Sequence, residues 1–245
     1  MNAPARVLLL GGTGEARALA ARLHPQVAVI SSLAGRVPDP ALPVGEVRIG
    51  GFGGRDGLAD WLRANAITAV VDATHPFAAT ITANAAAAAA QADLPHVVLA
   101  RPAWPDGDAI VVAADVEAAA VVSRNGYRRV FLTTGRSGTA AFRDTQAWFL
   151  IRAVTAPTAD LLPARHELLL SRGPYRVDGE RDLMRRHGID ALVTKNSGGD
   201  MTRAKLDAAA ELGVPVIMVS RPALPAGVRV VHSVDAAVDW LTARP

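Results

Sequence analysis

The stretch "VLLLGGTGEARALAARL", residues 7–23, joins an apolar run, a glycine turn and an amphipathic run. This order is typical of a βα unit that binds a nucleotide, because small residues let the backbone approach a phosphate at the positive end of a helix. The turn at residues 11–14 reads Gly-Gly-Thr-Gly and departs from the usual G-x-G-x-x-G spacing, since Arg17 stands in the third glycine position. We therefore expect a nucleotide on this turn, and a tight turn that binds nothing is the alternative.

Short apolar runs alternate with helical patterns along the rest of the chain. The predicted strands are residues 6–10, 26–30, 67–71, 96–100, 129–132, 148–151, 167–170, 190–193 and 215–219. The predicted helices include residues 14–23, 56–65, 77–92, 178–187 and 201–212. Because strands and helices alternate, the pattern predicts an α/β fold with parallel sheets of the doubly wound kind.

The chain also repeats itself at a nearly constant offset. A shift of 122 residues places "LLLGGTG" (8–14) on "VFLTTGR" (130–136) and "ITAVV" (67–71) on "IDALV" (189–193). This repetition predicts an internal duplication, with two Rossmann-like domains that face each other across a cleft. We place the domains at residues 1–102 and 103–245, and leave open whether the C-terminal helix packs back on the first domain.

The charge is divided unevenly between the two halves. Residues 1–122 hold 8 Lys and Arg against 11 Asp and Glu, whereas residues 123–245 hold 18 against 12. The basic excess predicts an anionic partner for the second half, and a solvated arginine-rich surface is the alternative. A nucleic-acid-binding surface would add exposed aromatic residues or a recognised motif, and we find neither.

Several other functions are disfavoured by what the sequence lacks. No apolar run reaches the ~18–20 residues that would cross a bilayer, and no signal pattern opens the chain, so we expect a cytoplasmic protein with no membrane partner. The chain has no cysteine, which excludes disulfides and thiolate metal sites. Its histidines show no metal-ligand spacing, and we expect no metal.

The end of the second predicted strand should select the nucleotide. A free ribose 2′-hydroxyl usually meets an Asp or Glu about 20 residues after the turn. The stretch "ISSLAGR", residues 30–36, has no carboxylate and offers Ser31, Ser32 and Arg36 beside Leu33. Hydroxyls and a guanidinium suit a 2′-phosphate, so the sequence favours NADP(H) over NAD(H). The alternative is that Arg36 only decorates a loop.

Cations follow several predicted strands at their carboxyl ends, where ligands of open α/β sheets bind. They are Arg101, Arg136, Arg172, Lys195 and Arg221. In the second half Arg136 stands where the first half has Gly14, and a large cation there would obstruct a dinucleotide but could meet a carboxylate. Polar donors lie beside these cations, at Thr134, Gly135, Asn196, Ser197 and Gly198. We therefore predict a substrate with several carboxylates.

The motifs "GGTGEAR", "SSLAGR", "DATHPFA" (72–78), "TTGR", "VTKNSGG" and "PVIMVSRP" together resemble the precorrin-6A reductase family of cobalamin biosynthesis over essentially the whole chain. The resemblance implies NADPH-dependent reduction of a tetrapyrrole, precorrin-6A, to precorrin-6B, with hydride delivered to a ring D double bond. It implies an NADP-binding first domain and a tetrapyrrole-binding second domain. The resemblance also leaves open whether neighbouring pathway enzymes contact this chain transiently as partners.

Residue roles follow from placing the motifs on the predicted elements. Glu15 joins the glycine turn, and Thr74, His75, Pro76 and Phe77 should lie beside the ribose-nicotinamide end of the cofactor. His75 and Lys195 are the candidate catalytic residues, although a packed, hydrogen-bonded histidine is an equal reading of His75 and positioning alone could supply most of the rate. A non-catalytic NADP-sensing regulator is the alternative function. It would keep the glycine turn but would not need a cationic second domain.

Overall fold

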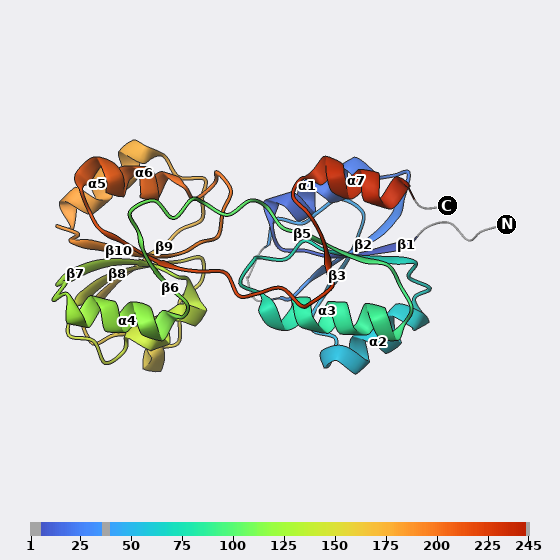
Figure 1. The fold of residues 1–245 in the computed structure, drawn as a ribbon, viewed down its shortest axis with the longest axis horizontal. Coiled ribbons are helices and arrows are strands. Elements are labelled where there is room, and N and C mark those ends of the chain that lie inside the picture. Colours follow the sequence, from blue (N-terminus) through green and yellow to red (C-terminus); the bar gives the residue numbers. More distant parts are fainter. Residues whose placement is uncertain (1–5, 36–39, 244–245) are drawn as a thin grey trace. The chain divides into compact units, whose positions relative to one another are not determined.

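The computed structural model describes residues 6–35 and 40–243, and the chain divides into two compact units. The first unit combines Met1–Pro102 with Pro222–Pro245, and the second is Ala103–Arg221. Each unit is a six-stranded, fully parallel sheet with helices on both faces (Figure 1). The α/β fold with two parallel sheets is thereby confirmed.

The first unit is built around the stretch that opens the chain. Its elements are β1 (Arg6–Leu10), α1 (Gly14–Leu23), β2 (Ala28–Leu33), β3 (Glu46–Ile49), α2 (Gly54–Ala64), β4 (Ala69–Asp72), α3 (Ala79–Gln91), β5 (His96–Leu99), β12 (Arg229–Val231) and α7 (Val234–Thr242). The strand order is β12-β5-β4-β1-β2-β3. The order in which successive strands are added therefore reverses between β1 and β4, and doubly wound folds bind their ligands at such a point.

The second unit repeats this plan, except that a short 3₁₀ helix stands where the first unit has the α-helix α1. Its elements are β6 (Ile110–Val112), α4 (Asp115–Arg124), β7 (Arg129–Thr133), the 3₁₀ helix η1 (Arg136–Phe142), β8 (Trp148–Ala153), the 3₁₀ turn η2 (Ala159–Leu161), β9 (His166–Leu170), α5 (Val177–Arg186), β10 (Ala191–Lys195), α6 (Ala204–Leu212) and β11 (Val216–Val219). The order β6-β11-β10-β7-β8-β9 matches the first sheet strand for strand. Matching strands start about 120 residues apart, as Glu46 and His166 do, which agrees with the duplication read from the sequence.

Both faces of each central strand are buried, so the strands are continuous apolar runs rather than alternating ones. In β1, Val7 and Leu9 pack with α1 and α7, while Leu8 and Leu10 pack with α2 and α3. Figure 1 shows these helix pairs on opposite faces of the first sheet, and α5 with α6 opposite α4 on the second. The side on which a strand residue lies therefore decides which helices its side chain can meet.

The C-terminal segment lies with the first unit, since β12 pairs with β5 and α7 packs on α1. The second unit accordingly ends at Arg221 and not at residue 245. Three edge strands, β3, β6 and β12, were not predicted, because each has only three or four residues and is partly exposed. In the part of the chain that the structure describes, no helix is long and apolar enough to cross a membrane.

Candidate cofactor and substrate sites

The glycine turn after β1 has the geometry that small residues permit. Gly12 adopts a φ of +106°, which favours glycine. A Cβ on Gly11 would come within 3.3 Å of the Ala16 Cβ, so glycine at this position lets the turn lie close against α1. The α-helix that begins at Gly14 directs its amino end toward the turn, as an anion-binding turn requires.

Thr13 is engaged within the protein and is 8% exposed. Its hydroxyl accepts a hydrogen bond from the Ala16 amide at 3.1 Å and donates to the Ala73 carbonyl at 2.7 Å. The first bond caps α1, and the second ties the turn to the end of β4. The predicted cofactor residue Thr13 therefore shapes the turn through its side chain.

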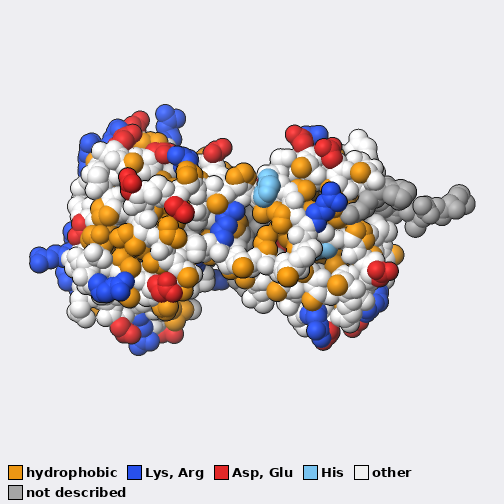
Figure 2. Space-filling view, viewed as in Figure 1, with side chains coloured by type: hydrophobic (Ala, Val, Ile, Leu, Met, Phe, Trp, Pro, Cys, Tyr) orange, Lys and Arg blue, Asp and Glu red, His pale blue; other side chains and the backbone are white. Residues whose placement is uncertain are grey.

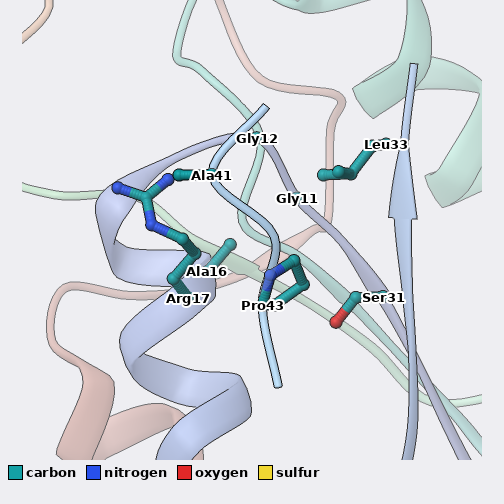
Figure 3. A pocket seen from close by; sticks show the side chains of 8 residues that line it. All are labelled: Gly11, Gly12, Ala16, Arg17, Ser31, Leu33, Ala41 and Pro43. Carbon is teal, nitrogen blue, oxygen red and sulfur yellow. The ribbon is translucent and has the colours of Figure 1, made fainter. Parts of the chain in front are cut away.

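A small pocket opens beside this turn (Figure 3). It is lined by Gly11, Gly12, Ala16, Arg17, Ser31, Leu33, Ala41 and Pro43. The Ser31 hydroxyl is buried and has no hydrogen-bond partner among the described residues. An unsatisfied buried hydroxyl is costly, so it indicates a ligand or water group that completes its bonding.

The two predicted serines lie on opposite faces of the sheet. Ser31 pairs with Leu9 and faces α1, whereas Ser32 pairs with Leu10 and faces α2 and α3. The Ser32 hydroxyl accepts a hydrogen bond at 2.9 Å from Arg48, which lies beside it on β3. The third predicted residue, Arg36, lies outside the described residues.

Arg48 is held firmly at the end of β3. Its guanidinium donates to the Gly50 and Gly51 carbonyls, each at 3.0 Å, and lies 3.7 Å from the centre of the Phe52 ring. These contacts place an oriented cation next to Ser32, on a short strand that the sequence pattern did not indicate.

The segment after β4 is organised by Asp72, which is 1% exposed. One carboxylate oxygen accepts from the Thr74 amide at 2.9 Å and from its hydroxyl at 2.6 Å. The other oxygen is buried without a partner among the described residues, as is Nε2 of His96 on the neighbouring strand. Burial lowers the pKa of His96, and the nearby Asp72 carboxylate opposes that shift.

His75 is exposed on this segment. The Phe77 amide donates to Nδ1 of His75 at 3.2 Å, and the two rings lie 5.9 Å apart. A neutral ring that accepts at Nδ1 carries its proton on Nε2. Pro76 and Phe77 are half-buried beside it.

Arg101 belongs to the first unit and pairs with Glu15 at 2.9 Å. Both side chains are largely buried, and the ion pair ties the segment after β5 to the first turn of α1, where Glu15 lies. Arg101, predicted to bind the substrate, and Glu15, predicted to bind the cofactor, thus neutralise each other's charge.

The other four predicted cations lie in the second unit, in two kinds of environment. Arg136 and Arg172 are exposed, and neither guanidinium has a charged or hydrogen-bonding partner in the described ranges. Lys195 is buried and forms an ion pair with Asp115 at 3.1 Å. On the face shown in Figure 2, basic side chains of this unit are separated by acidic ones and form no continuous basic patch.

The loop after β10 holds both ends of the second unit. The Asn196 side chain accepts from the Trp104 amide and donates to the Trp104 carbonyl, both at 2.9 Å, and the Trp104 indole donates to the Gly199 carbonyl at 2.8 Å. Arg221 donates to the carbonyls of Asn196 and Ser197 at 2.8 and 3.1 Å. Asn196 and Arg221 therefore order the loop through these contacts.

The remaining predicted donors lie in the turn after β7 and in the loop after β10. Thr134 is buried, Gly135 has a φ of +72°, and Gly198 has a φ of +67°. No group of three metal-ligating side chains occurs within residues 6–35 and 40–243.

A family model described as "Precorrin-6x reductase CbiJ/CobK" matches residues 6–242. The chain belongs to the precorrin-6x reductase family. A curated precorrin-6A reductase from Mycobacterium tuberculosis (strain CDC 1551 / Oshkosh) is 64% identical over 240 residues, with 98% of each chain covered. The precorrin-6A reductase of Rhodococcus erythropolis is 56% identical, covering 96% of this chain and 97% of the relative.

A solved structure agrees with this assignment. A structure described as CobK precorrin-6A reductase superposes on this member of the precorrin-6x reductase family with a TM-score of 0.89 and 37% identity, over 98% of this chain and 96% of the other. The fold and the family therefore rest on independent comparisons of sequence and of backbone.

Three polar residues of this precorrin-6x reductase escaped the sequence patterns as site residues. Arg17 was noted only as a departure from the glycine spacing, yet it lines the pocket. Arg48 lies on β3, a short edge strand that the sequence pattern did not indicate. Asp115 carries no local signal, because its partner Lys195 is 80 residues away in the chain.

Proposed function

We propose that this chain reduces precorrin-6A to precorrin-6B with NADPH. In this reaction one hydride and one proton would add across the ring D double bond, with NADPH oxidised to NADP⁺. The family match over residues 6–242 carries the proposal, and the glycine turn and its pocket support the cofactor.

The residues of the first unit fit a dinucleotide. The turn at Gly11 and Gly12 leaves room for a phosphate at the amino end of α1, and Arg17 adds a positive charge to the pocket. The unpartnered Ser31 hydroxyl is suited to a ribose or phosphate oxygen. Arg48 donates to Ser32 near the end of β2, and Arg36 follows that strand in the sequence. Both guanidinium groups suit a 2′-phosphate.

When bound, NADPH supplies the hydride, and the side chains described above orient the reactants and the proton. His75 is exposed and carries its proton on Nε2 when neutral, which makes it one candidate donor. Lys195 is the other candidate, or a ligand for a substrate carboxylate. Holding two reactants in one geometry supplies much of the rate of such a reaction.

The second unit supplies cations for the acetate and propionate arms of a tetrapyrrole. Arg136 and Arg172 are exposed after β7 and β9, where parallel strands present their carboxyl ends. The helix after β7 is the short 3₁₀ segment η1, so the long helix that a dinucleotide turn uses is replaced there. These differences favour a polycarboxylate over a second nucleotide.

The metal-free substrate is favoured by the relatives. Those named precorrin-6A reductase reach 64% and 56% identity, whereas the cobalt-precorrin-6A reductase of Priestia megaterium is 29% identical over 90% of this chain.

An assay of the purified chain tests the proposal. We expect loss of NADPH absorbance that requires precorrin-6A, with a product two mass units heavier and much slower turnover with NADH. A non-catalytic NADP-sensing regulator would bind NADPH in the same experiment and consume none, and that outcome would overturn the proposed activity.

A further inference from the structure

Asp115 and Lys195 form a largely buried ion pair in the second unit. Asp115 is the first residue of α4 and Lys195 is the last residue of β10, and their charged atoms lie 3.1 Å apart. The side chains are 23% and 11% exposed. An ion pair removed this far from water needs good geometry, because desolvation opposes its attraction.

The sheet register explains why the two meet. Leu192 of β10 packs with α5 and α6, so Lys195, three residues later, faces the opposite side, where α4 lies. Thr134, just after β7, faces this side as well, since Phe131 packs with Leu192 on the other. Asp115, Lys195 and Thr134 therefore lie together beside the point between β7 and β10 where the strand order reverses.

Asp115 is not needed to cap α4. The Glu117 carboxylate accepts from the Ala113 amide at 2.9 Å and supports the start of the helix, while Ala114 stands at the cap position. The Asp115 carboxylate is directed to Lys195 instead. Like Glu117, Asp115 is an acidic residue in the first turn and favours the helix dipole, and its carboxylate also pairs with Lys195.

The surroundings of the carboxylate are costly to maintain. Oδ1 of Asp115 and Oγ1 of Thr134 are both buried without a partner among the described residues. A Cβ on Gly138 would come within 2.8 Å of the first atom and 2.5 Å of the second, so only glycine fits there. A buried, unsatisfied carboxylate oxygen lowers stability, and its presence points to a functional reason for the pair.

We propose that Asp115 is a positioning residue for substrate binding, and this rests on the proposed function. An ammonium has three N–H donors, and holding one of them on Asp115 sets the direction of the others. Asp115 fixes the Lys195 ammonium so that it meets one carboxylate of the tetrapyrrole. It does not contact the substrate or the cofactor itself.

The test compares Asp115→Asn with Asp108→Asn, an exposed carboxylate of the same unit. In steady-state assays with NADPH and precorrin-6A, we expect Asp115→Asn to raise the substrate KM about tenfold, within the range of coupled neighbours. We expect kcat and the NADPH dissociation constant to stay within about twofold, and Asp108→Asn to match the unmodified chain.

A double variant separates positioning from a structural role. In a Lys195→Met background, Asp115→Asn should raise KM no further, because the group that it positions is gone. Additive effects, or a KM equal to that of Asp108→Asn, would overturn the inference alone. Absence of precorrin-6A reduction by the unmodified chain would instead overturn the proposed function. If Asp115→Asn fails to fold, Asp115→Glu keeps the charge at a displaced position and should give a smaller rise in KM.

Discussion

At the scale of single residues, a buried lysine sets a pH dependence in the second unit. Lys205 lies in the first turn of α6, is 5% exposed, and donates to the Thr202 carbonyl at 2.7 Å. Its ammonium lies 4.7 Å from the Trp104 ring centre, near the buried ion pair of Arg152 and Glu180. Burial lowers the pKa of Lys205 to about 7 from 10.5, with Glu180 opposing this shift and Arg152 adding to it.

We expect Lys205→Met to change stability most at low pH. Between pH 7 and 10.5 the unfolded chain binds more protons than the folded chain at this site, so the stability of the unmodified protein rises with pH. Below pH 7 the full cost of burying the charge is present. The advantage of Lys205→Met over the unmodified chain should therefore shrink by about 3 kcal/mol between pH 6.5 and 9.5.

Urea unfolding followed by tryptophan fluorescence at the two pH values measures this change. Arg185→Met, in the last turn of α5, adds a similar apolar side chain at an exposed position and should show no such pH dependence. An equal effect of Lys205→Met at both pH values would mean that the ammonium titrates as it does in water.

At the scale of elements, the two β–turn–helix units have diverged in length. After β1 the chain forms the ten-residue helix α1, capped by Thr13, whereas after β7 it forms the seven-residue 3₁₀ helix η1. The loop after β10 has likewise become an anchor for the segments around Trp104 and Arg221. The same strand order thus supports different turns.

We expect Asn196→Ala to lower the stability of the second unit. The substitution leaves the amide and the carbonyl of Trp104 without their shared partner, and Trp104 is 5% exposed. Two buried groups left unpaired should cost about 2–4 kcal/mol. The free energy of unfolding in urea measures the loss, and Gln146→Ala at an exposed position should change it by less than about 0.5 kcal/mol. A loss as small as that control would show that water replaces the Asn196 amide.

At the scale of the whole molecule, the proposed cofactor and substrate residues belong to different units. The glycine turn, Ser31 and Arg17 are in the first unit, and Arg136 is in the second. Single substitutions should therefore separate two binding constants.

We expect Arg36→Ala to weaken NADPH binding by about 1.5–3 kcal/mol and to leave NADH binding unchanged, since only NADPH has the 2′-phosphate.

Arg136→Ala should weaken the binding of precorrin-6A by about 1–3 kcal/mol and leave NADPH binding unchanged, and substrate binding should weaken as salt is added. Titrations of both ligands measure these constants. Arg22→Ala, an exposed arginine at the end of α1, is the control for both. Equal losses for NADPH and NADH would contradict the 2′-phosphate assignment, and an unchanged substrate constant would contradict the role of Arg136.

The sequence by itself determined the α/β class, nine of the twelve strands found among the described residues, the repeat at a nearly constant offset, and the family. Apolar runs buried on both faces and glycine turns are local signals, so they can be read without coordinates. The short strands β3, β6 and β12 lack that signal, because at a sheet edge burial depends on neighbours that only the fold supplies.

Only the tertiary structure decided which polar residues meet. It paired Arg101 with Glu15 and Lys195 with Asp115, and it placed Arg48 of β3 beside Ser32 of β2. It also returned the C-terminal β12 and α7 to the first unit. These outcomes depend on register and on contacts between residues 80 or more positions apart, such as Asp115 and Lys195, and a linear pattern carries no information about such distances.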